Sequence, residues 1–84
     1  MMELFDTIDW MTSIDYKKRF MAEYAQLRIR YERLRDMIRR YNDGILEFEP
    51  VSIDHLKRQA DVMSEYLSIL EERAVLEEVD LGQI

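Results

Sequence analysis

Arginines and tyrosines gather in the first half of this 84-residue chain, and together they suit a ligand that carries phosphate groups and aromatic bases. Six arginines and no lysine lie between residues 28 and 40, and tyrosines recur at positions 16, 24, 31 and 41. A guanidinium group grips phosphate through a planar fork of donors, and a tyrosine ring offers a base a stacking surface. The alternatives, tyrosines in a helical core and arginines attracted to an acidic neighbour, stay open.

A second candidate site lies in the other half, where polar residues interrupt an apolar pattern. Steps of three and four define an outer stripe, which consists of Gln59, Val62, Tyr66, Ile69, Arg73 and Leu76. A buried arginine without a partner is costly. Arg73 therefore predicts either an ion pair with a carboxylate of a neighbouring subunit, such as Glu65 or Glu72, or an anionic ligand at the interface.

Catalytic patterns were not found in the sequence. The single histidine, His55, lies at the third position of a predicted helix, where exposure or capping is expected rather than a role as base or ligand. There is no cysteine, no glycine-rich phosphate loop and no zinc-ligand spacing. We therefore expect a binding protein and not an enzyme, with no cofactor and no metal.

Three helical segments follow from the periodicity and the capping residues, all within one domain, 1–84. A short helix is predicted over 1–11. A first long helix is predicted over 13–42, with Thr12 as N-cap, Asp15 as its acidic box partner and Gly44 beyond its end. A loop over 43–51 contains Pro50, and a second long helix over 52–79 starts at the N-cap Ser52.

The predicted fold class is therefore all-α, an antiparallel helical hairpin with a short N-terminal helix. Each long helix carries one heptad seam, but the second also carries the outer stripe, which needs a second cover. A chain this small without disulfides or metals commonly gains stability by assembly. We expect a homo-oligomer; the alternative is a three-helix monomer in which residues 1–11 cover that stripe.

Charge is divided between the long helices. Nine basic and four acidic residues between 13 and 42 leave +5, whereas three basic and eight acidic residues between 52 and 80 leave −5. The net charge of −6 argues against general DNA binding. No apolar run has the length of a membrane span, and the N-terminus lacks the pattern of a signal peptide, so a cytoplasmic protein without membrane association is expected.

The order of residues in both long helices resembles a known family. The first helix reads Phe20-x-x-Glu23-Tyr24-x-x-Leu27-x-x-x-Tyr31-x-x-Leu34-x-x-x-Ile38, and the second reads Leu56-x-x-Gln59-x-x-Val62-Met63-x-x-Tyr66-x-x-Ile69-Leu70-x-x-Arg73. Together they resemble the phage-encoded helical-hairpin proteins that act as cyclic-nucleotide sponges against the CBASS and Thoeris immune systems. The resemblance covers about residues 16–76.

That resemblance implies a phage protein of the host cytoplasm that binds cyclic di- or trinucleotides, or cyclic ADP-ribose isomers, without cleaving them. It implies helical oligomers, often hexamers, with pockets between subunits. Arg73 and Gln59 would then lie near bound phosphate, and further expected ligand contacts are Tyr66, Tyr16, Lys17 and Lys18. Two other functions stay open: an anti-CRISPR-like inhibitor that binds a host protein through its acidic helix, and a structural module without a ligand.

Overall fold

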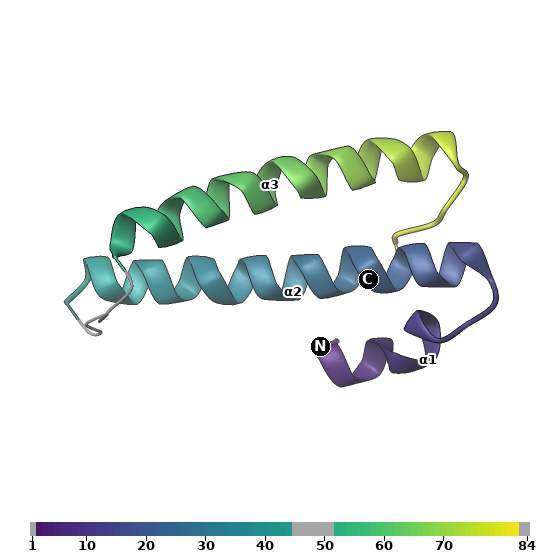
Figure 1. Ribbon diagram of the computed structural model, residues 1–84, viewed down its shortest axis with the longest axis horizontal. Coiled ribbons are helices and arrows are strands. Elements are labelled where there is room, and N and C mark those ends of the chain that lie inside the picture. Colours follow the sequence, from purple (N-terminus) through teal and green to yellow (C-terminus); the bar gives the residue numbers. More distant parts are fainter. Residues whose placement is uncertain (1, 45–51, 83–84) are drawn as a thin grey trace.

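The computed structural model describes residues 2–44 and 52–82, and every regular element in those ranges is a helix. A single 3-10 turn, η1 (Leu4–Thr7), leads into the short helix α1 (Ile8–Met11). Two long helices follow, α2 (Tyr16–Asn42) and α3 (Ile53–Leu76). They run antiparallel with α2 in the middle, and η1 and α1 pack on the side of α2 that faces away from α3 (Figure 1).

The start of α2 differs from the prediction, because Asp15 and not Thr12 is its N-cap. The Asp15 side chain accepts a hydrogen bond from the Lys17 amide at 2.9 Å, and its backbone is extended, as an N-cap requires. Thr12 instead ends α1, where its hydroxyl donates to the Ile8 carbonyl at 3.0 Å. The chain between the two helices is held by Arg19, which donates to the carbonyl oxygens of Ser13 and Ile14.

The remaining helix ends follow from local backbone chemistry. Gly44 adopts a φ of +76° after α2, as predicted, and the Ser52 hydroxyl caps α3 by accepting from the His55 amide. The predicted end of α3 near Val79 is wrong: the helix ends at Leu76, and Glu78 takes a left-handed φ of +57°. Hydrogen bonds from the Val79 amide to Ala74 and from the Glu78 amide to Val75 make this end a Schellman motif. The predicted loop residues 45–51, Pro50 included, lie outside the described residues.

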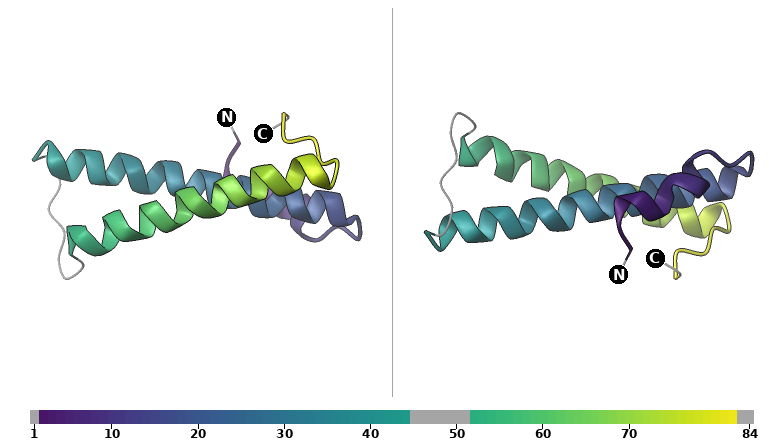
Figure 2. Two further views of the ribbon diagram at one scale, coloured as in Figure 1. Left: turned by 90° about the horizontal axis from the view of Figure 1, so that it is seen from above. Right: turned by 90° about the horizontal axis from the view of Figure 1, so that it is seen from below.

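The hydrophobic core lies between α2 and α3, in the half of the hairpin where α2 begins and α3 ends. Its buried members are Phe20, Tyr24, Leu67, Leu70, Ala74 and Val79. Leu70 is completely buried, and Val79 reaches the core because the Schellman turn folds the chain back. Seen from above, α2 and α3 cross near this core (Figure 2), and in the side view they come closer toward the loop (Figure 1). The core therefore joins the two helices in the half of the hairpin away from the loop.

The N-terminal segment covers α2, so it does not cover the outer stripe of α3. Ala22 and Ala25 are almost completely buried on α2, and their small side chains let η1 and α1 approach closely. Thr7 is fully buried there, and its hydroxyl accepts a hydrogen bond from the side-chain amide of Gln26 at 2.9 Å. The three-helix alternative, with residues 1–11 over the outer stripe, is therefore wrong, and Val62 and Leu76 on that stripe stay 66% and 83% exposed.

Among the described residues, none of the helices combines the length and the hydropathy that crossing a bilayer would require.

Candidate ligand site

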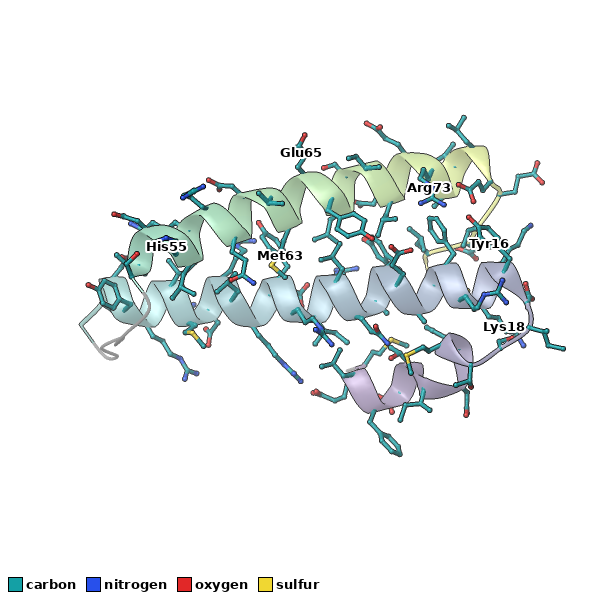
Figure 3. All side chains as sticks on the ribbon, viewed as in Figure 1. Tyr16, Lys18, His55, Met63, Glu65 and Arg73 are labelled. Atoms are coloured by element: carbon teal, nitrogen blue, oxygen red, sulfur yellow. The ribbon has the colours of Figure 1, made fainter. Side chains whose placement is uncertain are left out.

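Two residues predicted to contact a ligand, Tyr16 and Arg73, meet at the end of the hairpin opposite the loop, where α2 begins and α3 ends. We call Tyr16, Phe20, Arg73 and Glu77 the Arg73 cluster; Figure 3 shows Tyr16 and Arg73 facing each other across α2 and α3. The Arg73 guanidinium donates to the Tyr16 hydroxyl at 2.7 Å and to the Glu77 carboxylate at 2.8 Å. The Tyr16 hydroxyl in turn donates to Glu77 at 2.5 Å, which closes a hydrogen-bonded triangle.

The ionisation of the cluster reflects this triangle. Hydrogen bonds from Arg73 and then from Tyr16 hold the pKa of Glu77 below its ordinary value. The same bond to Glu77 raises the pKa of Tyr16, with desolvation adding to the effect. The pKa of Arg73 is raised, chiefly by its hydrogen bond to Glu77. At neutral pH the cluster therefore consists of a guanidinium, a carboxylate and a protonated phenol.

Arg73 is fixed in place and still keeps donors for a ligand. Its guanidinium lies 4.9 Å from the centre of the Phe20 ring, which restrains the plane of the group. Of the five N–H donors that an arginine carries, the two bonds to Tyr16 and Glu77 use two. The arginine side chain is 41% exposed, so the remaining donors can reach an anion.

Arg73 forms an ion pair within its own helix, with Glu77 four residues on. The sequence predicted either a carboxylate of a neighbouring subunit, such as Glu65 or Glu72, or an anionic ligand, and both of these stay predictions. The i to i+4 spacing of Arg73 and Glu77 brings the two side chains together on one face of the helix. The cost of placing a charge on an apolar stripe is therefore reduced within the single chain.

Of the other predicted contacts, Lys17 and Tyr66 lie near this cluster. The Lys17 ammonium donates to the Glu78 carbonyl at 3.2 Å. The Tyr66 hydroxyl donates to the Glu23 carboxylate, and this bond is the main cause of a raised Tyr66 pKa, which the charge of Arg73 opposes. The structure thus brings together Tyr16, Lys17, Tyr66 and Arg73.

Lys18 and Gln59 lie apart from the cluster. Both side chains are exposed, and neither makes a polar contact within the described residues. Gln59 precedes Arg73 by fourteen residues of continuous helix, or about 21 Å along the axis. A single small ligand on one chain would not span both residues.

The cations around the cluster are matched by carboxylates. Two cations, Arg73 and Lys17, lie near two carboxylates, those of Glu77 and Glu23, which accept hydrogen bonds from Arg73 and Tyr66. A phosphate group bound there would gain donors from Arg73 and also meet these carboxylates.

Most arginines of α2 are engaged by neighbouring acids. Arg28 pairs with Glu32, and Arg39 and Arg40 share Asp36 on the same helix. Arg33 reaches across to Glu3 and ties the N-terminal segment to α2. The sequence predicted attraction between the two long helices, but the partners of these arginines lie on α2 itself and in the N-terminal segment rather than on α3.

A groove of about 420 Å³ opens between the last part of α2 and the first part of α3. We call it the loop-end groove; residues that line it are Tyr31, Arg35, Arg39, Lys57, Ala60 and Asp61. Lys57 was not singled out in the sequence as a ligand contact. The groove was not predicted; the one sequence feature there is a small residue, Ala60, within a heptad seam made mostly of larger side chains.

The chain was compared with known proteins. No curated protein and no solved structure matches it. A family model described as Sequestin matches residues 14–76, about three quarters of the chain. The match runs through α2 and into the last residue of α3, so it contains most of the Arg73 cluster and the whole described wall of the loop-end groove. The chain therefore belongs to the Sequestin family, whose name denotes sequestration and fits the sponge proteins that its two long helices resemble.

Proposed function

We propose that this protein binds a cyclic nucleotide immune signal and holds it without cleaving it, as a phage anti-defence protein in the cytoplasm of the host. The ligand would be a cyclic di- or trinucleotide or a cyclic ADP-ribose isomer. The observation that carries the proposal is the Sequestin match over residues 14–76, because the family name denotes retention of a ligand. Sequestration of the signal would lower its free concentration and leave an immune effector inactive.

The side chains of the hairpin support this chemistry. Arg73 presents unused guanidinium donors to phosphate, and Tyr16 and Tyr66 offer phenol rings beside it. Lys17 adds a second cation, while Lys18 and Gln59 would contact ligand only from a different copy of the chain. These side chains offer hydrogen bonds, charge and stacking surfaces to a ligand. Holding the ligand intact is sufficient for sequestration, so the proposed function requires no bond of the ligand to break.

Assembly with further copies is part of the proposal, and α3 supplies the reason. The outer stripe leaves Val62, Ile69 and Leu76 exposed over four turns of one helix. The first turns of α3 carry the basic residues Lys57 and Arg58, whereas the charged residues of its later turns are mostly acidic. An antiparallel second copy of α3 would cover the stripe and set the basic end of each helix against the acidic part of the other.

Thermal denaturation in the presence of a ligand panel tests the function. The panel contains cyclic dinucleotides, cyclic trinucleotides and the cyclic ADP-ribose isomers, each present in excess over the protein. A ligand at 100 times its dissociation constant stabilises the folded state by about 2.7 kcal/mol. In a domain of this size that corresponds to a rise in Tm of roughly 10–20 °C. A folded protein whose Tm no member changes would contradict the proposal.

An acidic surface favours a second function, inhibition of a host immune enzyme through direct protein contact. Exposed carboxylates of α3, such as Glu65, Glu71 and Glu72, would steer the chain toward a basic surface. A stoichiometric protein partner from host lysate, lost at high salt and obtained with no bound nucleotide, would favour this function over sequestration.

A further inference from the structure

We infer that the loop-end groove is a second anion site, which binds a phosphate group together with an aromatic base. The inference rests on the proposed function and names where in the hairpin such a ligand would bind. It differs from the Arg73 cluster in position, because the groove lies at the opposite end of α2 and α3. It also differs in charge, as the lining residues make clear.

The hollow lies beside a small residue of the α3 seam. Ala60 is nearly buried at the position of that seam that faces α2, and its side chain of one methyl group fills little of the space between the helices. Figure 2 shows that the two helices cross at an angle, so their axes are not parallel along the groove. The groove has a volume of about 420 Å³ and is broadly open to solvent.

Charge in the groove favours an anion. Three cations, Arg35, Arg39 and Lys57, line it together with one carboxylate, that of Asp61. Arg39 forms an ion pair with Asp36, which Arg40 also contacts. Lys57 makes no hydrogen bond or ion pair within the described part of the chain. The lining therefore carries a net charge of +2, or +1 when Asp36, the ion-pair partner of Arg39, is counted. The two cations near the Arg73 cluster are matched by the carboxylates of Glu23 and Glu77, so phosphate is favoured more in this groove than at that cluster.

Tyr31 and Arg35 together supply both recognition elements. The Arg35 guanidinium lies 5.5 Å from the centre of the half-buried Tyr31 ring. Tyr31 precedes Arg35 by about one turn of α2. Within the described residues Arg35 makes no hydrogen bond or ion pair, so all of its donors stay available for phosphate oxygens. A nucleotide base can stack on a tyrosine ring or on a guanidinium plane. The pair thus offers stacking and charge from a single face of α2.

Two changes should impair binding in the groove by different means. Ala60→Leu fills the hollow and leaves every charge in place. The double substitution Arg35→Gln and Lys57→Gln removes two cations and leaves the volume nearly unchanged. The matched control is Arg30→Gln with Arg58→Gln, which removes one arginine from each helix at positions outside the groove lining.

Binding of three probes, cyclic di-AMP, cyclic tri-AMP and cyclic ADP-ribose, is measured by calorimetry for the full chain and each variant. For any probe that binds, we expect Ala60→Leu to abolish binding at this site. We expect the double Gln variant to weaken binding about 100-fold, at about tenfold for each cation removed, and the control pair to weaken it less than threefold. Amide NMR shifts on ligand addition should concentrate at 31–39 and 57–61.

The outcomes separate the two proposals. A probe that binds equally well to all variants, or whose NMR shifts cluster around Tyr16 and Arg73 alone, overturns the groove inference and leaves the proposed function standing. If none of the probes binds the folded protein, the groove inference is contradicted for these ligands, and the proposed function falls only if no member of the full ligand panel changes the Tm. Because the double Gln variant changes only surface side chains, it keeps the test valid even if Ala60→Leu does not fold.

Discussion

Adjacent residues of α3, Leu70 and Ile69, should respond very differently to truncation. Leu70 is completely buried in the core, whereas Ile69 lies on the outer stripe and is 47% exposed in the single chain. Leu70→Ala removes buried methyl groups and leaves a cavity, at a cost of about 3 kcal/mol in unfolding free energy. Ile69→Ala in a dilute monomer loses only part of the burial of one side chain and leaves no cavity, at a cost of about 1 kcal/mol.

These free energies convert into measurable melting temperatures. In a domain of 60–100 residues each kcal/mol shifts Tm by roughly 4–8 °C, so Leu70→Ala should lower Tm by about 12–24 °C and Ile69→Ala by about 4–8 °C. The helical circular dichroism signal is followed on heating at protein concentrations from about 1 to about 100 μM. If a second copy covers the outer stripe, the Tm of the wild-type chain should rise with concentration.

The two variants then distinguish core from interface. Leu70→Ala should keep the concentration dependence, whereas Ile69→Ala should lose most of it because the contact between copies is weakened. An Ile69→Ala variant as destabilised as Leu70→Ala at the lowest concentration would refute the reasoning that Ile69 lies outside the core of the single chain. A wild-type Tm independent of concentration would contradict the proposed pairing of copies.

Three further predictions concern single side chains. Glu78→Gly should raise unfolding free energy by about 0.5–1 kcal/mol, seen as a higher Tm, because Glu78 holds a left-handed φ of +57°; an unchanged or lower Tm would contradict it. The pKa of Glu77 lies below its ordinary value of 4.5, so its carboxylate stabilises the fold above that pH and loses the contribution as pH falls through the folded pKa. Glu77→Gln should therefore lose less stability than wild type in melts between about pH 5 and pH 3; equal losses would exclude this role. Thr7→Ala should cost about 1 kcal/mol in a denaturant titration, because the Gln26 amide loses its buried hydroxyl acceptor, whereas no change would show that the N-terminal segment adds little stability.

Periodicity and capping chemistry predicted most of the fold. The seams of both helices place Phe20 and Leu70 in the core, and Ser52 and Gly44 behave as their residue types require. The start of α2 was misplaced because Thr12 and Asp15 are both good capping residues, and sequence alone does not tell which turn each one serves. The Schellman end at Glu78 was missed because a glutamate rarely adopts a left-handed backbone.

The site was predictable only in part, for a geometric reason. Arg73 and Tyr16 were chosen for their chemistry, and the antiparallel pairing of the hairpin brings them into contact. The Glu77 partner was not predicted, although its i to i+4 spacing from Arg73 on one helix is visible in the sequence. The loop-end groove depends on the angle at which α2 and α3 cross, and the spacing of residues such as Ala60 along the sequence does not encode that angle.

Retention of an intact ligand is tested most directly by depletion and recovery. A cyclic nucleotide that raises the Tm of the protein is incubated with an excess of the protein. The mixture is then filtered to remove protein, and the filtrate is assayed for the nucleotide by mass spectrometry. The protein fraction is then heated and assayed again. We expect a filtrate depleted of the nucleotide and near-complete recovery of the unchanged molecule after heating. Recovery of a linear or hydrolysed product, or a filtrate that still contains all of the nucleotide, would contradict this expectation.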